Sequence, residues 1–152
     1  MLTDTLRPLF ARDLNRVHQE IELYHEEARI WHVDAGIANS AGNLTLHLVG
    51  NLNTYIGAQL GGVAYPRDRD REFWQKDVPR AELLRQVAET RDLVDHALSQ
   101  LKPHDLAAEY PLLVFEAKTT TEYLLVHLAT HLAYHLGQIN YHRRLLDGSG
   151  VA

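Results

Sequence analysis

The sequence predicts an all-α protein, an antiparallel four-helix bundle. Three observations predict this fold. Four stretches repeat apolar residues every three or four positions, which is the period of an amphipathic helix. Each stretch is three turns or longer, and segments containing glycine, proline or alternating charges separate them. The 152 residues match one ordinary domain in size, so we expect a single domain spanning residues 1–152.

The first helix is predicted from about Thr5 to Arg29. Pro8 falls in its first turn, where the missing N–H of proline is tolerated. Residues 31–39 break the pattern and contain Gly36, which indicates a connecting loop. The apolar positions of this helix are Leu6, Leu9, Phe10, Leu14, Val17, Ile21, Tyr24 and Ala28.

The second helix is predicted to begin after Ser40, whose hydroxyl can cap it, and to run to about Leu60. Gly61 and Gly62 follow, and glycine readily adopts the left-handed conformation that ends a helix. The third helix is predicted from Pro79 to about Lys102.

The fourth helix is predicted from Thr120 to about Asp147. Thr119, followed by Glu122 three positions later, is a capping-box pattern at its start. The preceding residues, 105–118, show no clear period, and Leu112 to Phe115 are expected to form a short extended piece.

Charges alternate from Arg67 to Glu72, in what we expect to be a long irregular loop. One interpretation is a solvated loop held together by surface ion pairs, each of which contributes little. The other is that one arginine folds over a pocket and binds an anionic substrate, because guanidinium suits planar bidentate contacts.

Composition excludes several classes of function. A net charge of -5, with no basic cluster larger than Arg143-Arg144, argues against a nucleic-acid partner. No apolar run approaches the roughly 20 residues that span a bilayer, and the first residues lack the apolar core of a signal peptide, so we expect no membrane association and a cytoplasmic location. The chain has no cysteine, and any metal must therefore be bound by His, Asp or Glu.

Histidines recur at helical spacing in the fourth helix. His127, His131 and His135 step by four and border the apolar face, where unpaired imidazoles are costly. Residues at i and i+4 have Cβ atoms about 5–6 Å apart, so two imidazole nitrogens can converge on one ion. The second helix supplies an obvious third ligand in His47. The pattern predicts a divalent-metal site between these helices, with zinc or nickel as the expected ion and iron as another possible one.

Two segments resemble the signatures of the DinB-like superfamily of metal-dependent proteins. They are His47 within residues 43–52, and residues 130–139, which contain His-x-x-x-His followed by x-Gly-Gln. The resemblance implies a four-helix bundle, His47, His131 and His135 as ligands, and a homodimer. The commonest pattern places arginine before Gly-Gln; this chain has Leu136, so no role of that arginine is carried over.

The resemblance also implies thiol chemistry on a small-molecule substrate. A low-molecular-weight thiol, such as bacillithiol, mycothiol or glutathione, would be activated at the metal, as in a thiol S-transferase or a related hydrolase. The alternative is a non-catalytic, stress-associated metal-binding protein; bis-histidine haem binding is a third interpretation. We expect Asn51 and Gln138 to orient a ligand imidazole or a bound water, and His127 to neighbour the site without binding the ion.

Overall fold

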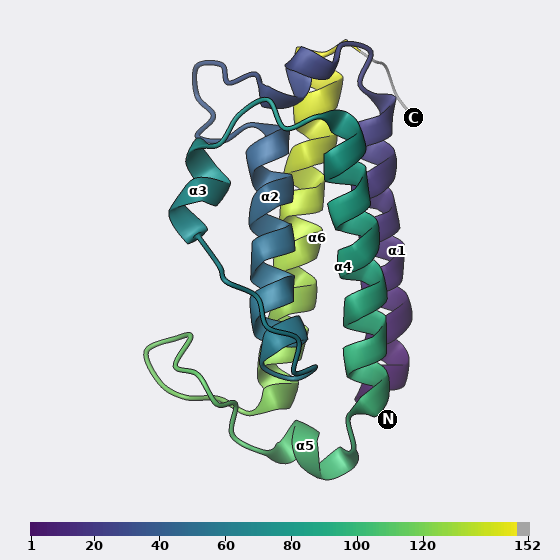
Figure 1. Cartoon of the computed structure of the whole chain (residues 1–152), viewed down its shortest axis with the longest axis vertical. Coiled ribbons are helices and arrows are strands. Elements are labelled where there is room, and N and C mark those ends of the chain that lie inside the picture. Colours follow the sequence, from purple (N-terminus) through teal and green to yellow (C-terminus); the bar gives the residue numbers. More distant parts are fainter. Residues whose placement is uncertain (149–152) are drawn as a thin grey trace.

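A computed structural model of the chain describes residues 1–148. The described residues form helices and no β-strand, apart from an isolated bridge between Glu109 and Thr120. The four longest helices lie side by side (Figure 1). In that view α1 and α6 run upward, whereas α2 and α4 run downward. The long helices are α1 (Leu2–Leu23), α2 (Ala41–Leu52), α4 (Arg80–Gln100) and α6 (Thr121–Leu146). The short ones are η1 (Glu27–Trp31), η2 (Asn53–Ala58), α3 (Arg69–Trp74) and α5 (Pro103–Ala107).

Helix α2 is covered by neighbouring elements along its whole length. It contacts α3, α4 and α6, while α1 packs against α4 and α6. All 12 residues of α2 are buried, which distinguishes it from the amphipathic helices around it. The side chain of His47 is therefore held in a helix that is enclosed on every side.

The start and end of the second helical stretch agree with the sequence. Ser40 caps α2, because its hydroxyl accepts a hydrogen bond from the backbone N–H of Asn43 at 3.1 Å. After Leu52 the chain continues as the π-helix η2, and Gly62 then adopts a φ of 68°. The predicted cap is confirmed, and the glycine ends the helical segment as expected.

Helix α1 ends at Leu23, six residues before the predicted end at Arg29. The backbone N–H groups of His25 and Glu26 donate to the carboxylate of Asp147 instead, at 2.8 and 3.2 Å. This contact with the end of α6 replaces the next turn of helix, and a 3-10 turn, η1, follows. The sequence pattern could not reveal it, because the partners are more than a hundred residues apart.

Helix α6 is capped by Thr120, whose hydroxyl accepts from the N–H of Tyr123, and the predicted cap at Thr119 is wrong. The carbonyl of Thr119 accepts from the N–H of Tyr110 at 2.8 Å, which ties this residue to the preceding chain. The extended piece predicted at residues 112–115 is also wrong. Leu112 and Phe115 lie in bends, Leu113 and Val114 have no regular structure, and helix α5 lies before them.

The charged segment after Gly62 contains a short helix, α3, where the sequence suggested an irregular loop. Asp68 caps it by accepting from the N–H of Arg71 at 3.0 Å. The side-chain amide of Asn43 donates to the carbonyls of Glu72 and Gln75, at 2.9 and 2.8 Å, and fastens α3 to α2.

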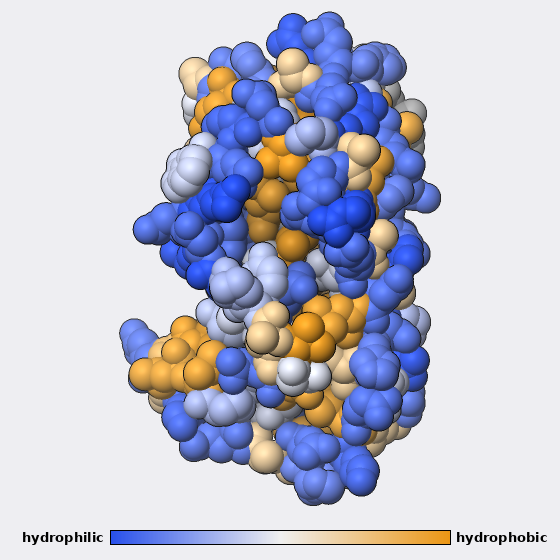
Figure 2. All heavy atoms as spheres, in the orientation of Figure 1, coloured by the Kyte–Doolittle hydropathy of each residue, from blue (hydrophilic) through white to orange (hydrophobic). Residues whose placement is uncertain are grey.

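Figure 2 shows a largely hydrophilic face with a notch at its left edge. By comparison with Figure 1, α3 lies above this notch and the loop between α5 and α6 lies below it. Hydrophobic atoms gather on that lower projection, where Leu113 is 64% exposed. In the described part of the chain, no helix has both the length and the apolar character needed to cross a membrane.

Candidate metal centre

The three histidines that the sequence predicts as ligands lie together. His47 projects from α2, and His131 and His135 project from successive turns of α6. His131 Nε2 lies 3.2 Å from His47 Nε2 and 3.1 Å from His135 Nε2. Each histidine offers one nitrogen, and these nitrogens all lie within 4.8 Å of one another. We call this group the three-histidine cluster.

The orientation of His47 is set by Glu72 on α3. His47 Nδ1 lies 3.1 Å from Glu72 Oε1, and both side chains are buried. A carboxylate accepts hydrogen bonds, so Nδ1 carries the proton and donates it to Glu72. The Nε2 of His47 therefore presents its lone pair to the cluster, which is the arrangement that metal-bound histidines usually have.

Glu72 is itself held by Arg67. Arg67 Nε donates to Glu72 Oε2 at 2.9 Å, and its Nη2 donates to Oε1 at 3.0 Å. The guanidinium also lies over the ring of Tyr55, 5.5 Å from its centroid, and the arginine side chain is only 13% exposed. Arg67 is thus engaged inside the protein, neither part of a solvated loop nor free to bind an anionic substrate.

Gly50 makes room for this carboxylate. A Cβ atom placed on Gly50 would lie 1.8 Å from Glu72 Oε2, so no larger residue fits without displacing Glu72. The histidine spacing does not predict this contact, but the glycine itself is a signal for it. A glycine inside a helix costs about 1 kcal/mol relative to alanine, and one located three positions after His47 indicates a close neighbour.

His135 is oriented in the same way by Gln138. His135 Nδ1 lies 2.7 Å from Gln138 Oε1, so Nδ1–H donates to the amide oxygen and Nε2 again presents a lone pair. The Nε2 atoms of His47 and His135 both face His131 Nε2, where a single proton satisfies only one of them well. The buried Nδ1 of His131 has no hydrogen-bond partner within the described residues.

This donor set fits a divalent cation. Zinc–nitrogen bonds of 2.0–2.1 Å place two ligands of a tetrahedral ion roughly 3.3 Å apart, which is close to the observed separations of 3.1 and 3.2 Å. One ion would satisfy all three converging lone pairs. The three-histidine cluster could therefore hold a metal ion.

The protonation states suit this role. Burial lowers the pKa of His131 to about 4, and the neighbouring His135 and His47 contribute to this shift, so the imidazole is neutral at pH 7. Burial alone would raise the pKa of Glu72, but hydrogen bonds from His47 and Arg67 outweigh it and hold the pKa below its ordinary value. Glu72 therefore remains a carboxylate that can accept the proton of His47 Nδ1.

A family model described as the DinB superfamily matches residues 1–139. The chain belongs to the DinB superfamily. The match includes all three histidines of the cluster and Gln138, and it confirms the resemblance that the sequence motifs suggested. No curated protein matches the chain.

Two further residues that the sequence predicts beside the site of this DinB-superfamily chain, His127 and Asn51, do not belong to the cluster. The ring of His127 stacks 6.0 Å from that of His131 and meets Phe115 edge-on at 4.8 Å. Asn51 is buried on α2, and its Oδ1 has no hydrogen-bond partner within the described residues. His127 thus continues the histidine row toward the loop between α5 and α6.

His142 belongs to the packing of the fold. Its Nδ1 lies 2.6 Å from the hydroxyl of Tyr24, and its Nε2 lies 2.8 Å from the carbonyl of His32. The carbonyl requires a proton on Nε2, so Nδ1 accepts from the tyrosine. These bonds fasten α6 to the segment that connects α1 with α2.

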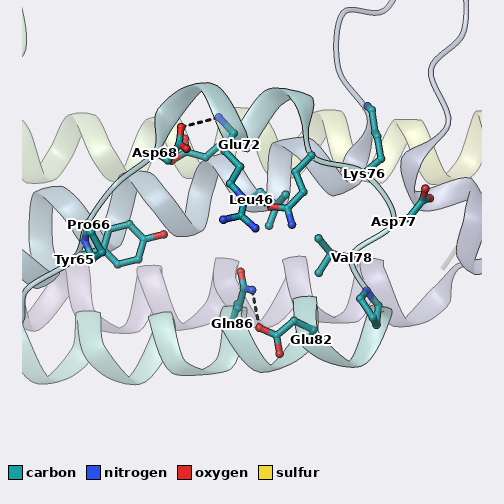
Figure 3. A pocket seen from close by; sticks show the side chains of 13 residues that line it. Leu46, Tyr65, Pro66, Asp68, Glu72, Lys76, Asp77, Val78, Glu82 and Gln86 are labelled. Carbon is teal, nitrogen blue, oxygen red and sulfur yellow. Dashed lines mark hydrogen bonds between the residues drawn. The ribbon is translucent and has the colours of Figure 1, made fainter.

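A cavity of about 660 Å³ adjoins the cluster and is lined in part by His135 and Gln138. It lies between α6 and the loop before α2. A second cavity, of about 500 Å³, lies between α3 and α4 (Figure 3). Glu72 lines the second cavity together with charged side chains of both signs, but none of its lining residues is a histidine. Of these two cavities, the first shares a residue with the three-histidine cluster and the second does not.

Proposed function

We propose that this protein is a divalent-metal-dependent enzyme that transfers a low-molecular-weight thiol, through its sulfur, to an electrophile. The ligands are His47, His131 and His135. The observation that carries the proposal is the convergence of three imidazole nitrogens from two helices beside a cavity that shares His135. Three protein ligands leave a coordination position for water or substrate, which is typical of catalytic sites; closed structural sites have four.

The cation supplies Lewis acidity when bound: it lowers the pKa of a coordinated thiol and polarises an electrophile. The chain supplies the orientation. Glu72 holds His47 and Gln138 holds His135, so both Nε2 atoms stay directed into the cluster. The sulfur must come from outside, since the chain has no cysteine. In the transfer a carbon–sulfur bond forms, the leaving group departs with its bonding electron pair, and the thiol proton passes to solvent.

Imidazole ligands are compatible with zinc, nickel and iron, and we propose zinc or nickel as the resident ion. Elemental analysis of the protein as purified, beside His47→Ala and His127→Ala variants, identifies the ion. We expect about one ion per chain in the wild type and in His127→Ala, and little in His47→Ala. Equal metal content in wild type and His47→Ala would refute the ligand assignment.

Turnover is tested by the loss of free thiol with a panel of electrophiles. Metal-loaded wild type is compared with His131→Ala, which removes the central nitrogen of the cluster. His127→Ala is the matched control, because it removes an imidazole one turn earlier on the same helix. We expect thiol loss above background for wild type and the control, and none for His131→Ala. Equal rates in all three proteins would reject the enzyme.

A non-catalytic metal protein is the second candidate, and one observation favours it: an ion at the cluster would join α2 to α6. Chelation separates the two candidates. A steep fall in melting temperature on metal removal, with no effect of thiols on the loaded form, supports the structural role. A thiol that binds only the metal-loaded form supports the enzyme.

The arrangement of the four long helices is part of the same proposal. We propose that they form the antiparallel four-helix bundle of the DinB-like type, as one domain over residues 1–152. Helices α1 and α6 run opposite to α2 and α4 in Figure 1, and the packing of α1 against α4 and of α2 against α6 supports the antiparallel arrangement. A bundle of this kind gathers side chains from facing helices into one internal site, which is how His47 meets the histidines of α6.

A further inference from the structure

We infer that the cavity beside His135 binds an uncharged ligand with a mainly apolar body, and that this ligand is the electrophile of the reaction. The inference names the substrate class of the proposed enzyme and rests on that proposal only in calling the ligand a substrate. The cavity of about 660 Å³ falls within the range of 300–1,000 Å³ that small-molecule sites occupy. It is lined by α6 and by the loop of residues 34–39.

The walls of this cavity are rich in exposed apolar side chains. Ile37, Tyr134, Tyr141 and Leu145 line it, and their exposed fractions are 41, 66, 63 and 76%. Leu44 of α2 contributes buried apolar surface. Single exposed hydrophobic residues are ordinary on a protein surface, but four around one cavity mark a binding surface. Two aromatic rings on the same face of α6, two turns apart, suit a flat or aromatic ligand.

The charges around the cavity argue against an anionic ligand. No lysine or arginine lines it, and Asp34 is the carboxylate in its wall. The guanidinium of Arg144 lies over the ring of Tyr141, 5.3 Å from its centroid, and does not line the cavity. A ligand carrying carboxylates, sulfonates or phosphates would meet the charge of Asp34 with no lining cation to balance it. An uncharged ligand avoids this penalty.

Two polar side chains, His135 and Gln138, line the cavity where it meets the cluster. Gln138 accepts from His135 Nδ1 through its amide oxygen, and within the described chain its amide nitrogen makes no hydrogen bond. That N–H group can donate to a carbonyl or similar acceptor on the ligand. The ring of Tyr134 meets that of His135 at a centroid distance of 5.3 Å. A ligand lying along Tyr134 is thereby held close to the cluster, with its polar atom near Gln138.

The test uses two probes of the same shape, 2-acetonaphthone, which is uncharged, and naphthalene-2-sulfonate, which is anionic. Binding to the zinc-loaded protein is measured by saturation-transfer NMR and titration. Ala38→Trp fills the cavity from its exposed loop, and Tyr134→Ala removes one wall. Tyr123→Ala is the matched control, because it removes a similarly exposed tyrosine of α6 outside the cavity. Unfolding curves check that each variant is folded.

We expect the uncharged probe to bind at least tenfold more tightly than the sulfonate. Ala38→Trp and Tyr134→Ala should each weaken it tenfold or more, and Tyr123→Ala should leave it unchanged. Equal binding of both probes, or unchanged binding to Ala38→Trp, overturns the inference. Binding of the uncharged probe without any thiol turnover leaves the cavity assignment in place and rejects the enzyme. Turnover with an unchanged KM in Ala38→Trp overturns the cavity assignment and leaves the enzyme in place.

Discussion

The direction of the His47 ring is fixed by a carboxylate 25 positions further along the chain. Glu72 reaches it because Arg67 neutralises and aligns the carboxylate, and because Gly50 has no side chain in the way. None of these residues alone fixes the orientation of the His47 ring. Together they place a lone pair of His47 where a metal would be bound, so we expect the affinity for metal to depend on residues that never touch it.

Glu72→Gln should weaken metal binding by about 10- to 100-fold, the range found when partners of metal-bound histidines are removed. The amide is a weaker acceptor for His47 Nδ1–H and loses the ion pair with Arg67. Competition with a chromophoric zinc chelator measures the change. Glu89→Gln, at an exposed ion pair of α4, is the control and should bind as wild type does. Wild-type affinity in Glu72→Gln would contradict the orienting role.

The orienting role of Glu72 can also be tested without removing its charge. Gly50→Ala should also weaken metal binding, because the added methyl group displaces Glu72. Gly137→Ala is the matched substitution in α6, where an added Cβ meets nothing within 4 Å. It should leave metal binding intact and raise stability by up to about 1 kcal/mol, since alanine is the better helix former. Equal effects of the two substitutions would argue against the role of Gly50.

His142 should make the metal-free protein sensitive to acid. Burial lowers its folded-state pKa below the ordinary 6.5, so the unfolded chain binds more protons below that pH. The free energy of unfolding should therefore fall as the pH drops below about 6.5. In His142→Gln this fall should be shallower, whereas His104→Gln, at an exposed position, should keep the wild-type slope. Urea unfolding across this pH range measures it; identical slopes in all three proteins would contradict the assignment.

At the scale of elements, the position of α2 relative to α3 determines whether His47 meets Glu72. The cap at Ser40 begins the helix, and the side chain of Asn43 then joins its first turn to the end of α3. Ser40 also donates to Asn43 Oδ1 at 2.7 Å, so one hydroxyl orders both the helix start and the amide that holds α3. The registration of His47 with Glu72 follows from this local arrangement.

Ser40→Ala should lower the free energy of unfolding by about 1 kcal/mol, within the range of 0.5–2 kcal/mol for a lost helix cap. The loss reflects the uncapped N–H of Asn43 and the hydrogen bond that its buried side chain no longer receives. Ser99→Ala, near the exposed end of α4, is the control and should change stability little. Urea denaturation compares them, and similar losses for both would remove the special role of Ser40.

At the scale of the whole molecule, the cluster links two helices that are far apart in sequence. His47 and His131 are 84 positions apart, so an ion held by both opposes the separation of α2 from α6. Binding to the folded chain alone stabilises it by mass action. Metal content and global stability should therefore change together.

Adding zinc to about 100 times its dissociation constant should stabilise the metal-free protein by about 2.7 kcal/mol. The gain should vanish in His47→Ala and in His131→Ala, each of which removes a nitrogen of the cluster. It should persist in His127→Ala. Thermal unfolding with and without zinc measures the shift, and a gain of the same size in all four proteins would place the ion elsewhere.

The parts that could be predicted from the sequence are those encoded by local spacing. The pairing of His131 with His135 follows from one helical turn, and the cap at Ser40 follows from residue type. The helix α3 and the early end of α1 depend on contacts between distant segments, such as Asn43 with α3 and Asp147 with the residues after α1. No period in the sequence reports such contacts.

The two sides of the cluster also differ in their surroundings. Because α2 is enclosed along its whole length, deuterium should reach its peptide N–H groups only when the chain opens globally. Helix α6 has one solvent-exposed face, on which Tyr134 and Tyr141 lie. Its peptide N–H groups should exchange through smaller local openings. Of the residues that would hold an ion, His47 therefore lies on the slowly exchanging helix, and His131 and His135 lie on the faster one.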